Sequence, residues 1–160
     1  MSSFPLSQKY IDFINTTNVS AEFLEGTTAS GKTTVGAGVK FMRMVSQSKK
    51  KIHAIAAKTT GKAEETIIQQ DNGILDLHRN AVYCGNGDKD YKLPHIKFEG
   101  KIIYILGYSS RDKWEMVLGA QFGCVYIDEI NTADIEFIRE MSTRNDYLLA
   151  TRSEERRVGK

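Results

Sequence analysis

The stretch Glu25-Gly-Thr-Thr-Ala-Ser-Gly-Lys-Thr-Thr34 decides the fold, because it completes the pattern G-x-x-x-x-G-K-[ST]. The residues before it, at positions 21–25, predict a short buried strand, and those after it predict a helix to about position 48. A strand, a glycine-containing loop and a helix in this order are typical of a phosphate-binding loop. The sequence therefore predicts a nucleotide site where that helix begins.

The residues of this loop have distinct expected roles. Gly26 and Gly31 let the backbone turn, so that its N–H groups and the helix N-terminus face a phosphate. The ammonium group of Lys32 can reach the β- and γ-phosphates, and the hydroxyl of Thr33 can ligate Mg²⁺. ATP and Mg²⁺ are therefore the expected cofactors. The expected nucleotide-binding residues of the loop are Gly26, Thr27, Thr28, Ala29, Ser30, Gly31, Lys32, Thr33 and Thr34.

A pair of acidic residues ends a second informative stretch, Gly123-Cys-Val-Tyr-Ile-Asp-Glu129. Its apolar residues predict a strand beside the one that leads into the phosphate loop, so both sites open at one end of the sheet. There Asp128 would hold Mg²⁺, and Glu129 would orient and deprotonate the attacking water. The alternative is that both acids only cap a helix that begins near Asn131.

Strands and helices alternate along most of the chain. Apolar runs at positions 52–57, 101–106 and 147–151 predict strands, and positions 62–71, 114–119 and 132–141 predict helices. This alternation is typical of a mainly parallel sheet. Asn86-Gly87 is a hairpin-turn signal within positions 79–100. The expected fold class is α/β, a three-layer RecA-like P-loop fold with a β-hairpin insertion.

Length and composition indicate one globular domain, because 160 residues with 41% hydrophobic and 26% charged side chains can bury a core. Residues 1–5 show neither the basic nor the apolar region typical of a leader, and no apolar run is long enough to span a bilayer, so we expect a cytoplasmic protein without a membrane partner. The net charge of +2 arises in residues 152–160. Overall charge therefore gives no argument for nucleic-acid binding. We expect an ATPase domain at residues 1–151 and, because the composition changes abruptly, an anomalous tail at 152–160 foreign to the natural gene.

The two cysteines, Cys84 and Cys124, lie far apart in apolar surroundings and are expected to be buried free thiols. The histidines, His53, His78 and His95, show no ligand spacing with them. No zinc site is therefore expected.

Several residues are weaker candidates for the site. Gln8 lies in a helix expected at positions 5–14, where a glutamine recognises adenine in several motor ATPases; a solvated polar residue is an equally open alternative. Thr151 ends the last expected strand, where a hydroxyl can sense the γ-phosphate and signal to a moving partner. Lys58 follows the second strand, on the crevice side of the sheet, and is a candidate for phosphate or DNA contact.

Three further basic or aromatic features have plain structural alternatives. Arg111 or Lys113 can reach a γ-phosphate or a neighbouring subunit's nucleotide, although surface charges at a helix start are favoured. Lys49-Lys-Lys51 can contact DNA phosphates, although a solvated turn after a helix is favoured. Trp114 is expected to be a packing anchor.

With both nucleotide motifs placed, the chain resembles the N-terminal ATPase domain of tailed-phage terminase large subunits. The resemblance rests on positions 23–34, 106–108, 113–114, 126–133 and 147–151, and covers about residues 5–151. Gly26 to Thr34 match the family's phosphate loop, Asp128 and Glu129 its magnesium-binding and catalytic acids, and Ala150-Thr151 the start of its coupling motif. The chain departs from the family in three ways. Arg152 stands where members continue with Asn-Pro, the phosphate loop has no arginine, and the nuclease domain is missing.

The resemblance implies an ATP-hydrolysing motor that acts on double-stranded DNA and packages it into proheads. It also implies a homo-oligomeric ring, with the terminase small subunit and the portal as partners. Nuclease activity is not expected. Two alternatives stay open: a helicase-like or recombination ATPase of the same fold, and a non-catalytic nucleotide-binding fragment.

Overall fold

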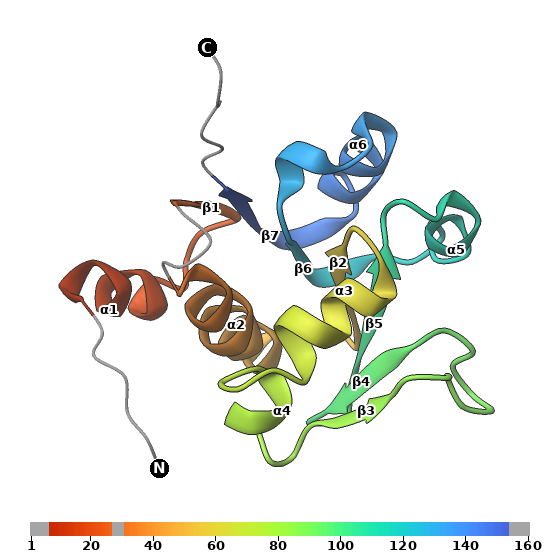
Figure 1. The fold of residues 1–160 in the computed structure, drawn as a ribbon, viewed down its shortest axis with the longest axis horizontal. Coiled ribbons are helices and arrows are strands. Elements are labelled where there is room, and N and C mark those ends of the chain that lie inside the picture. Colours follow the sequence, from red (N-terminus) through yellow and green to blue (C-terminus); the bar gives the residue numbers. More distant parts are fainter. Residues whose placement is uncertain (1–6, 27–30, 154–160) are drawn as a thin grey trace.

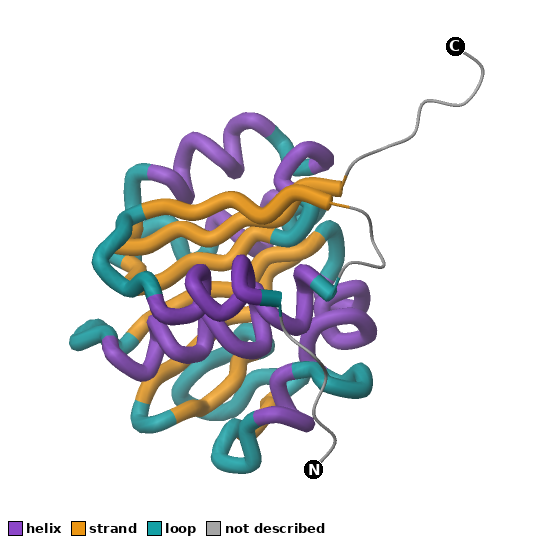
Figure 2. Tube along the Cα trace, turned by 90° about the vertical axis from the view of Figure 1, so that its left-hand side faces the viewer, coloured by secondary structure: helices purple, strands orange, loops and turns teal. Residues whose placement is uncertain are grey.

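The computed structural model describes residues 7–26 and 31–153. Within them, seven strands form one sheet in the order β1-β7-β6-β2-β5-β4-β3, and helices cover both of its faces (Figures 1 and 2). Neighbouring strands from β1 to β5 are parallel, whereas β4 and β3 are antiparallel. The predicted three-layer α/β fold with a hairpin insertion is therefore confirmed. The strands are β1 (Ala21–Gly26), β2 (Ile52–Ala57), β3 (Val82–Cys84), β4 (His95–Phe98), β5 (Lys101–Gly107), β6 (Phe122–Ile127) and β7 (Asn145–Ser153).

The helices that follow the phosphate loop and β2 pack on one face of the sheet. Phe41, Ile67 and Tyr126 belong to the core of this face and are buried. Helix α1 lies against the outside of the phosphate-loop helix (Figure 1). The elements of this layer are α1 (Gln8–Asn15), the π-helical η2 (Thr34–Phe41), α2 (Met42–Gln47), α3 (Thr60–Ala63), the π-helical η3 (Glu64–Ile68) and α4 (Ile74–Leu77).

The opposite face is covered by α5 (Arg111–Glu115) and α6 (Ile135–Ser142), with a single 3-10 turn, η4 (Ile130–Thr132), before α6. Trp114 and Phe137 are buried there, with ring centroids 5.3 Å apart. The role of Trp114 as a packing anchor is therefore confirmed. All six residues of β6 are buried, because the strand has a helical layer on each side.

The sheet differs from the prediction in the placement of β1. This strand is not buried but forms an edge, and the Phe23 side chain is 64% exposed. It also does not neighbour β6, because β7 lies between them and pairs with both in parallel. The physical reason is the side-chain pattern: β7 buries Leu148 and Leu149 on opposite faces, whereas β1 alternates exposed and half-buried residues.

Several element boundaries also differ from the prediction. Helix α3 begins at Thr60, because the Thr59 side chain accepts a hydrogen bond from the Lys62 N–H. Helix α6 begins after Asp134, whose side chain caps the Glu136 N–H. Helix α5 ends at Glu115, so the helix expected at positions 114–119 lies several residues earlier. Strand β7 extends to Ser153, two residues past the predicted strand.

Among the described residues, no helix has the length and apolar character needed to cross a membrane.

Candidate nucleotide-binding site

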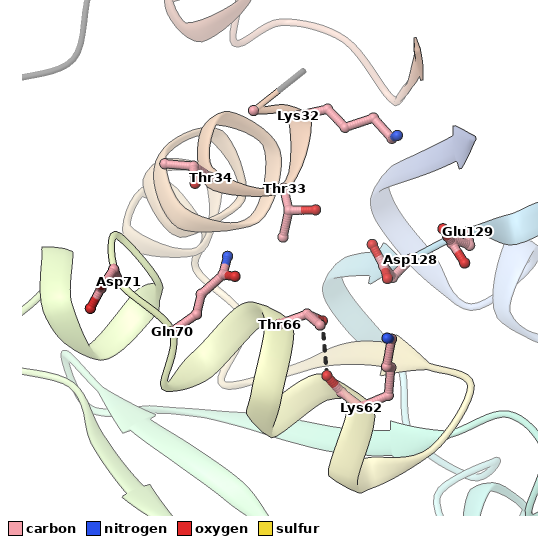
Figure 3. Close-up of a pocket in the computed structure, with 10 residues that line it drawn as sticks. Lys32, Thr33, Thr34, Lys62, Thr66, Gln70, Asp71, Asp128 and Glu129 are labelled. Atoms are coloured by element: carbon pink, nitrogen blue, oxygen red, sulfur yellow. Dashed lines mark hydrogen bonds between the residues drawn. The ribbon is translucent and has the colours of Figure 1, made fainter. Parts of the chain in front are cut away.

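A cavity of about 380 Å³ opens at the carboxyl ends of the central strands. Three elements surround it: the start of the phosphate-loop helix, the helix formed by α3 and η3, and the end of β6 (Figure 3). The cavity is lined by Gly31, Lys32, Thr33, Thr34, Lys62, Thr66, Gln70, Asp71, Asp128 and Glu129. The structure therefore brings both predicted motifs to one site.

The phosphate-loop side is built from a glycine turn and a buried lysine. Gly31 has a φ of +77°, a conformation that residues with a Cβ rarely adopt. The Lys32 side chain is buried, and its ammonium group donates a 3.0 Å hydrogen bond to the Gly26 carbonyl. The predicted nucleotide-binding residues Thr27, Thr28, Ala29 and Ser30 lie outside the described part of the chain.

The acidic side is fixed by Thr151, which is fully buried at the end of β7. Its hydroxyl donates to the Asp128 Oδ1, 3.2 Å away, and accepts a 2.9 Å hydrogen bond from the Glu129 N–H. Glu129 has φ 51° and ψ 59°, in the left-handed region that costs energy for a residue with a side chain. The Thr151 hydroxyl thus holds the two acids in a strained turn at the end of β6.

Two more hydroxyl groups support this turn from the other face of the sheet. Tyr108 is buried, and its hydroxyl lies 3.1 Å from the Asp128 carbonyl and 2.6 Å from the Thr132 Oγ1. The Thr132 hydroxyl lies 2.9 Å from the Glu129 carbonyl. Because both carbonyls have hydroxyl partners, the turn keeps its hydrogen bonds without regular secondary structure.

The electrostatics of Asp128 favour a bound cation. Burial raises the pKa of this carboxyl group, while the Thr151 hydrogen bond and the Tyr126 hydroxyl, 3.3 Å from Oδ1, act in the opposite direction. A buried carboxylate that lacks a partner is destabilised, and a nearby positive charge stabilises its ionised form. Thr33 lines the same cavity and contributes a hydroxyl oxygen. Carboxylate and hydroxyl oxygens are hard ligands of the kind Mg²⁺ prefers, so this pair fits the ion.

One wall of the cavity was not predicted from the sequence. Lys62 and Thr66 lie four residues apart on one face of the helix that follows β2, and Gln70 lies just past the end of that helix. In Figure 3 the Lys62 side chain extends toward Asp128 from the side opposite Lys32. The four-residue spacing of polar side chains, together with the position after a parallel strand, is the signal that could have indicated this wall.

The weaker candidates lie elsewhere. Gln8 is exposed, and its side-chain amide donates a 2.8 Å hydrogen bond to Asp12. It does not line the cavity, so recognition of adenine by Gln8 stays a prediction. Lys58 and Arg111 line a second cavity of about 370 Å³. Arg111 forms ion pairs with Glu115 and Glu136 of its own chain. Lys113 is exposed.

The lysine run at positions 49–51 is likewise engaged within the chain. Lys50 forms a 2.9 Å ion pair with Asp146. The Lys51 ammonium group lies 5.6 Å from the centre of the Tyr91 ring. Contact between this run and DNA stays a prediction.

The sequence matches no family model, and it has no match among curated proteins. Solved structures do match. The large terminase from a thermophilic bacteriophage superposes with a TM-score of 0.70 at 17% identity, covering 93% of this chain and 39% of the terminase. The same terminase in complex with ATP-γ-S gives 0.69 at 17% identity, over 92% of this chain and 38% of the terminase.

A third structure, the same phage's large terminase in complex with ADP, superposes with a TM-score of 0.64 at 19% identity and covers 93% of this chain and 38% of that one. The chain thus spans about two fifths of the length of the terminases it matches. At these identities the likeness establishes the fold. The chain has the fold of the matched part of a phage large terminase.

Proposed function

We propose that this chain binds ATP with Mg²⁺ and hydrolyses it, as the motor domain of a phage terminase large subunit that drives double-stranded DNA into proheads. One observation carries the proposal: Asp128 and Glu129, held by Thr151, share one cavity with Lys32 and Thr33. If the loop matched the pattern only by chance, two acids would not be expected on the opposite wall of the same cavity.

Each of these residues has a role that follows from its position. Lys32 binds the β- and γ-phosphates of ATP. To do so, its ammonium group gives up the hydrogen bond to the Gly26 carbonyl. Thr33 and Asp128 hold Mg²⁺, which when bound neutralises charge on the phosphate oxygens. Glu129 orients the attacking water and accepts its proton.

The coupling of hydrolysis to DNA movement is supported by the fold of the solved large terminases. From the resemblance to terminase large subunits, we also propose that the protein forms a homo-oligomeric ring. Its partners would be the terminase small subunit and the portal. Thr151 suits a coupling role, because it contacts both acids and belongs to the strand between β1 and β6.

The test is the substitution Glu129→Gln, which keeps the size of the side chain but removes its basicity. We expect ATP affinity within a few-fold of the parent, and hydrolysis lower by about 10²–10⁴-fold because the general base is lost. Binding is measured by calorimetry and hydrolysis by phosphate release, with and without double-stranded DNA. Glu65→Gln is the matched control, because Glu65 is exposed and does not line the cavity.

Equal hydrolysis by the Glu129→Gln variant and the parent would show that another group activates the water. A parent chain that binds ATP but releases no phosphate, even with DNA, would contradict the motor assignment and favour a non-catalytic fragment.

A further inference from the structure

We propose that Cys84, Asp88 and His95 form a second metal site, specific for a thiolate-binding divalent cation such as Zn²⁺. It lies on the β3–β4 hairpin, at the opposite edge of the sheet from β1. One sulfur, one imidazole nitrogen and one carboxylate oxygen of these residues lie within 4.8 Å of one another. The site is independent of ATP hydrolysis.

His95 supplies the strongest observation. Its side chain is fully buried, and its Nδ1 lies 2.8 Å from the Leu93 carbonyl. A carbonyl oxygen only accepts, so Nδ1 carries a proton, and in a neutral imidazole Nε2 then keeps the lone pair that a metal ion can use. This Nε2 has no hydrogen-bond partner, although a buried polar atom is normally paired. A histidine held in this way by a backbone carbonyl is oriented as a metal ligand.

Cys84 is brought to His95 by the register of the hairpin. The two residues are direct partners across the antiparallel pair of β3 and β4. Directly opposite residues project from the same face with their Cβ atoms about 5 Å apart. The Cys84 side chain is only partly buried, in contrast to the prediction, and its thiol is free. A cation can therefore reach the sulfur from solvent.

Asp88 completes the set because the loop between β3 and β4 folds back over the pair. Its Oδ1 accepts hydrogen bonds from the N–H groups of Asp90, at 3.0 Å, and Tyr91, at 2.8 Å. This fixes the carboxylate and leaves Oδ2 3.4 Å from the His95 Nε2. The predicted turn signal Asn86-Gly87 lies within this loop, and the residues that follow it position the carboxylate.

A positive charge already lies at this point. The Lys97 ammonium group is 2.7 Å from Asp88 Oδ2. The position beside this carboxylate oxygen therefore already accommodates a cation. The Lys97 side chain is 48% exposed, so it can move into water when a metal ion takes its place.

The donor set determines which ion fits. A thiolate selects for Zn²⁺ and related cations over Mg²⁺ and Ca²⁺, which prefer oxygen ligands. Three protein ligands leave a fourth tetrahedral position for water. The residue pattern does not reveal this site, because its ligands come from two strands and a loop and lack the close spacing of common zinc motifs.

The chain also contains a matched negative control, the pair His53 and Cys124. Both ring nitrogens of His53 are engaged, Nε2 with the Lys50 carbonyl and Nδ1 with the Cys124 N–H, each at 2.9 Å. Burial raises the pKa of the Cys124 thiol to about 12, so this sulfur resists conversion to a thiolate. A cysteine and a histidine are present there without a free nitrogen lone pair.

The experiment titrates the tag-free chain with Co²⁺ as a spectroscopic probe and with Zn²⁺ as its competitor. We expect one Co²⁺ per chain, a near-ultraviolet thiolate-to-cobalt absorption band, and loss of the band when Zn²⁺ is added. Cys84→Ser should abolish the band, His95→Gln and Asp88→Asn should weaken binding, and Cys124→Ala should leave band and affinity unchanged. Lys97→Gln should tighten binding several-fold, because it removes the competing cation.

A band that survives Cys84→Ser, or that disappears in Cys124→Ala, would overturn the proposal. Absence of binding at one equivalent of Co²⁺ in the parent would also overturn it. As a readout independent of cysteine substitution, Zn²⁺ should raise the melting temperature of the parent more than that of the Asp88→Asn variant. An equal rise in both proteins would count against the site.

Discussion

At the scale of the residue, Thr151 is the side chain on which the geometry of the two acids, Asp128 and Glu129, depends. Its hydroxyl bonds both the Asp128 carboxylate and the Glu129 N–H. Thr151→Val keeps the shape but removes both hydrogen bonds. We expect ATP hydrolysis to fall by about 10- to 100-fold through misplacement of Glu129, while ATP affinity changes little.

The same substitution leaves the Glu129 N–H without its acceptor, which should lower the free energy of unfolding by about 1–3 kcal/mol. Thr151→Ser restores the hydroxyl and should recover most of the hydrolysis rate. If the valine variant were destabilised but hydrolysed ATP at the parent's rate, Thr151 would be a structural residue only. Steady-state kinetics and urea denaturation of the three proteins separate these outcomes.

At the scale of the element, a buried lysine connects α1, β1 and the phosphate-loop helix. Lys40 is fully buried, its ammonium group lies 2.8 Å from the Glu22 carboxylate, and it donates to the Phe13 and Thr16 carbonyls at the end of α1. Lys40→Met leaves the Glu22 charge without this partner. We expect a loss of about 3 kcal/mol in the free energy of unfolding, measured by urea denaturation.

Lys50→Met is the matched control, because Lys50 also pairs with a carboxylate but both side chains are well exposed. It should change the free energy of unfolding by less than about 1 kcal/mol. Amide exchange in residues 8–15 should accelerate in Lys40→Met and not in Lys50→Met. Equal effects of the two substitutions would mean that Lys40 does not dock α1.

At the scale of the whole molecule, the sequence predicted the fold class and both nucleotide motifs, because local patterns encode them. The phosphate loop needs glycines at fixed positions, and buried parallel strands need continuous apolar runs. The turn-forming role of Thr151, by contrast, depends on β7 lying between β1 and β6. Strand order is a property of long-range pairing, which the residue pattern of one strand does not encode.

Two further features of the molecule were not predicted because they form where separate elements meet. The wall formed by Lys62, Thr66 and Gln70 and the cluster of Cys84, Asp88 and His95 both depend on how separate elements meet. Boundaries of the short helices were wrong by a few residues where a side-chain cap, such as that of Asp134, decided the start. The glycine-containing loop and the apolar strands, each set by one continuous segment, were predicted. Helix starts decided by a local cap and features set by contacts between segments were found in the structure.

The most direct test of the account is the equilibrium binding of ATP-γ-S to the parent chain and to Lys32→Ala, measured by calorimetry in the presence of Mg²⁺. We expect one nucleotide per parent chain, and an affinity lower by about 10- to 100-fold in the variant, because a charged hydrogen bond to phosphate is lost. Lys58→Ala, outside this cavity, should bind as the parent does. Equal affinities of the parent and Lys32→Ala, or no binding by the parent, would contradict the assignment of this cavity as the nucleotide site.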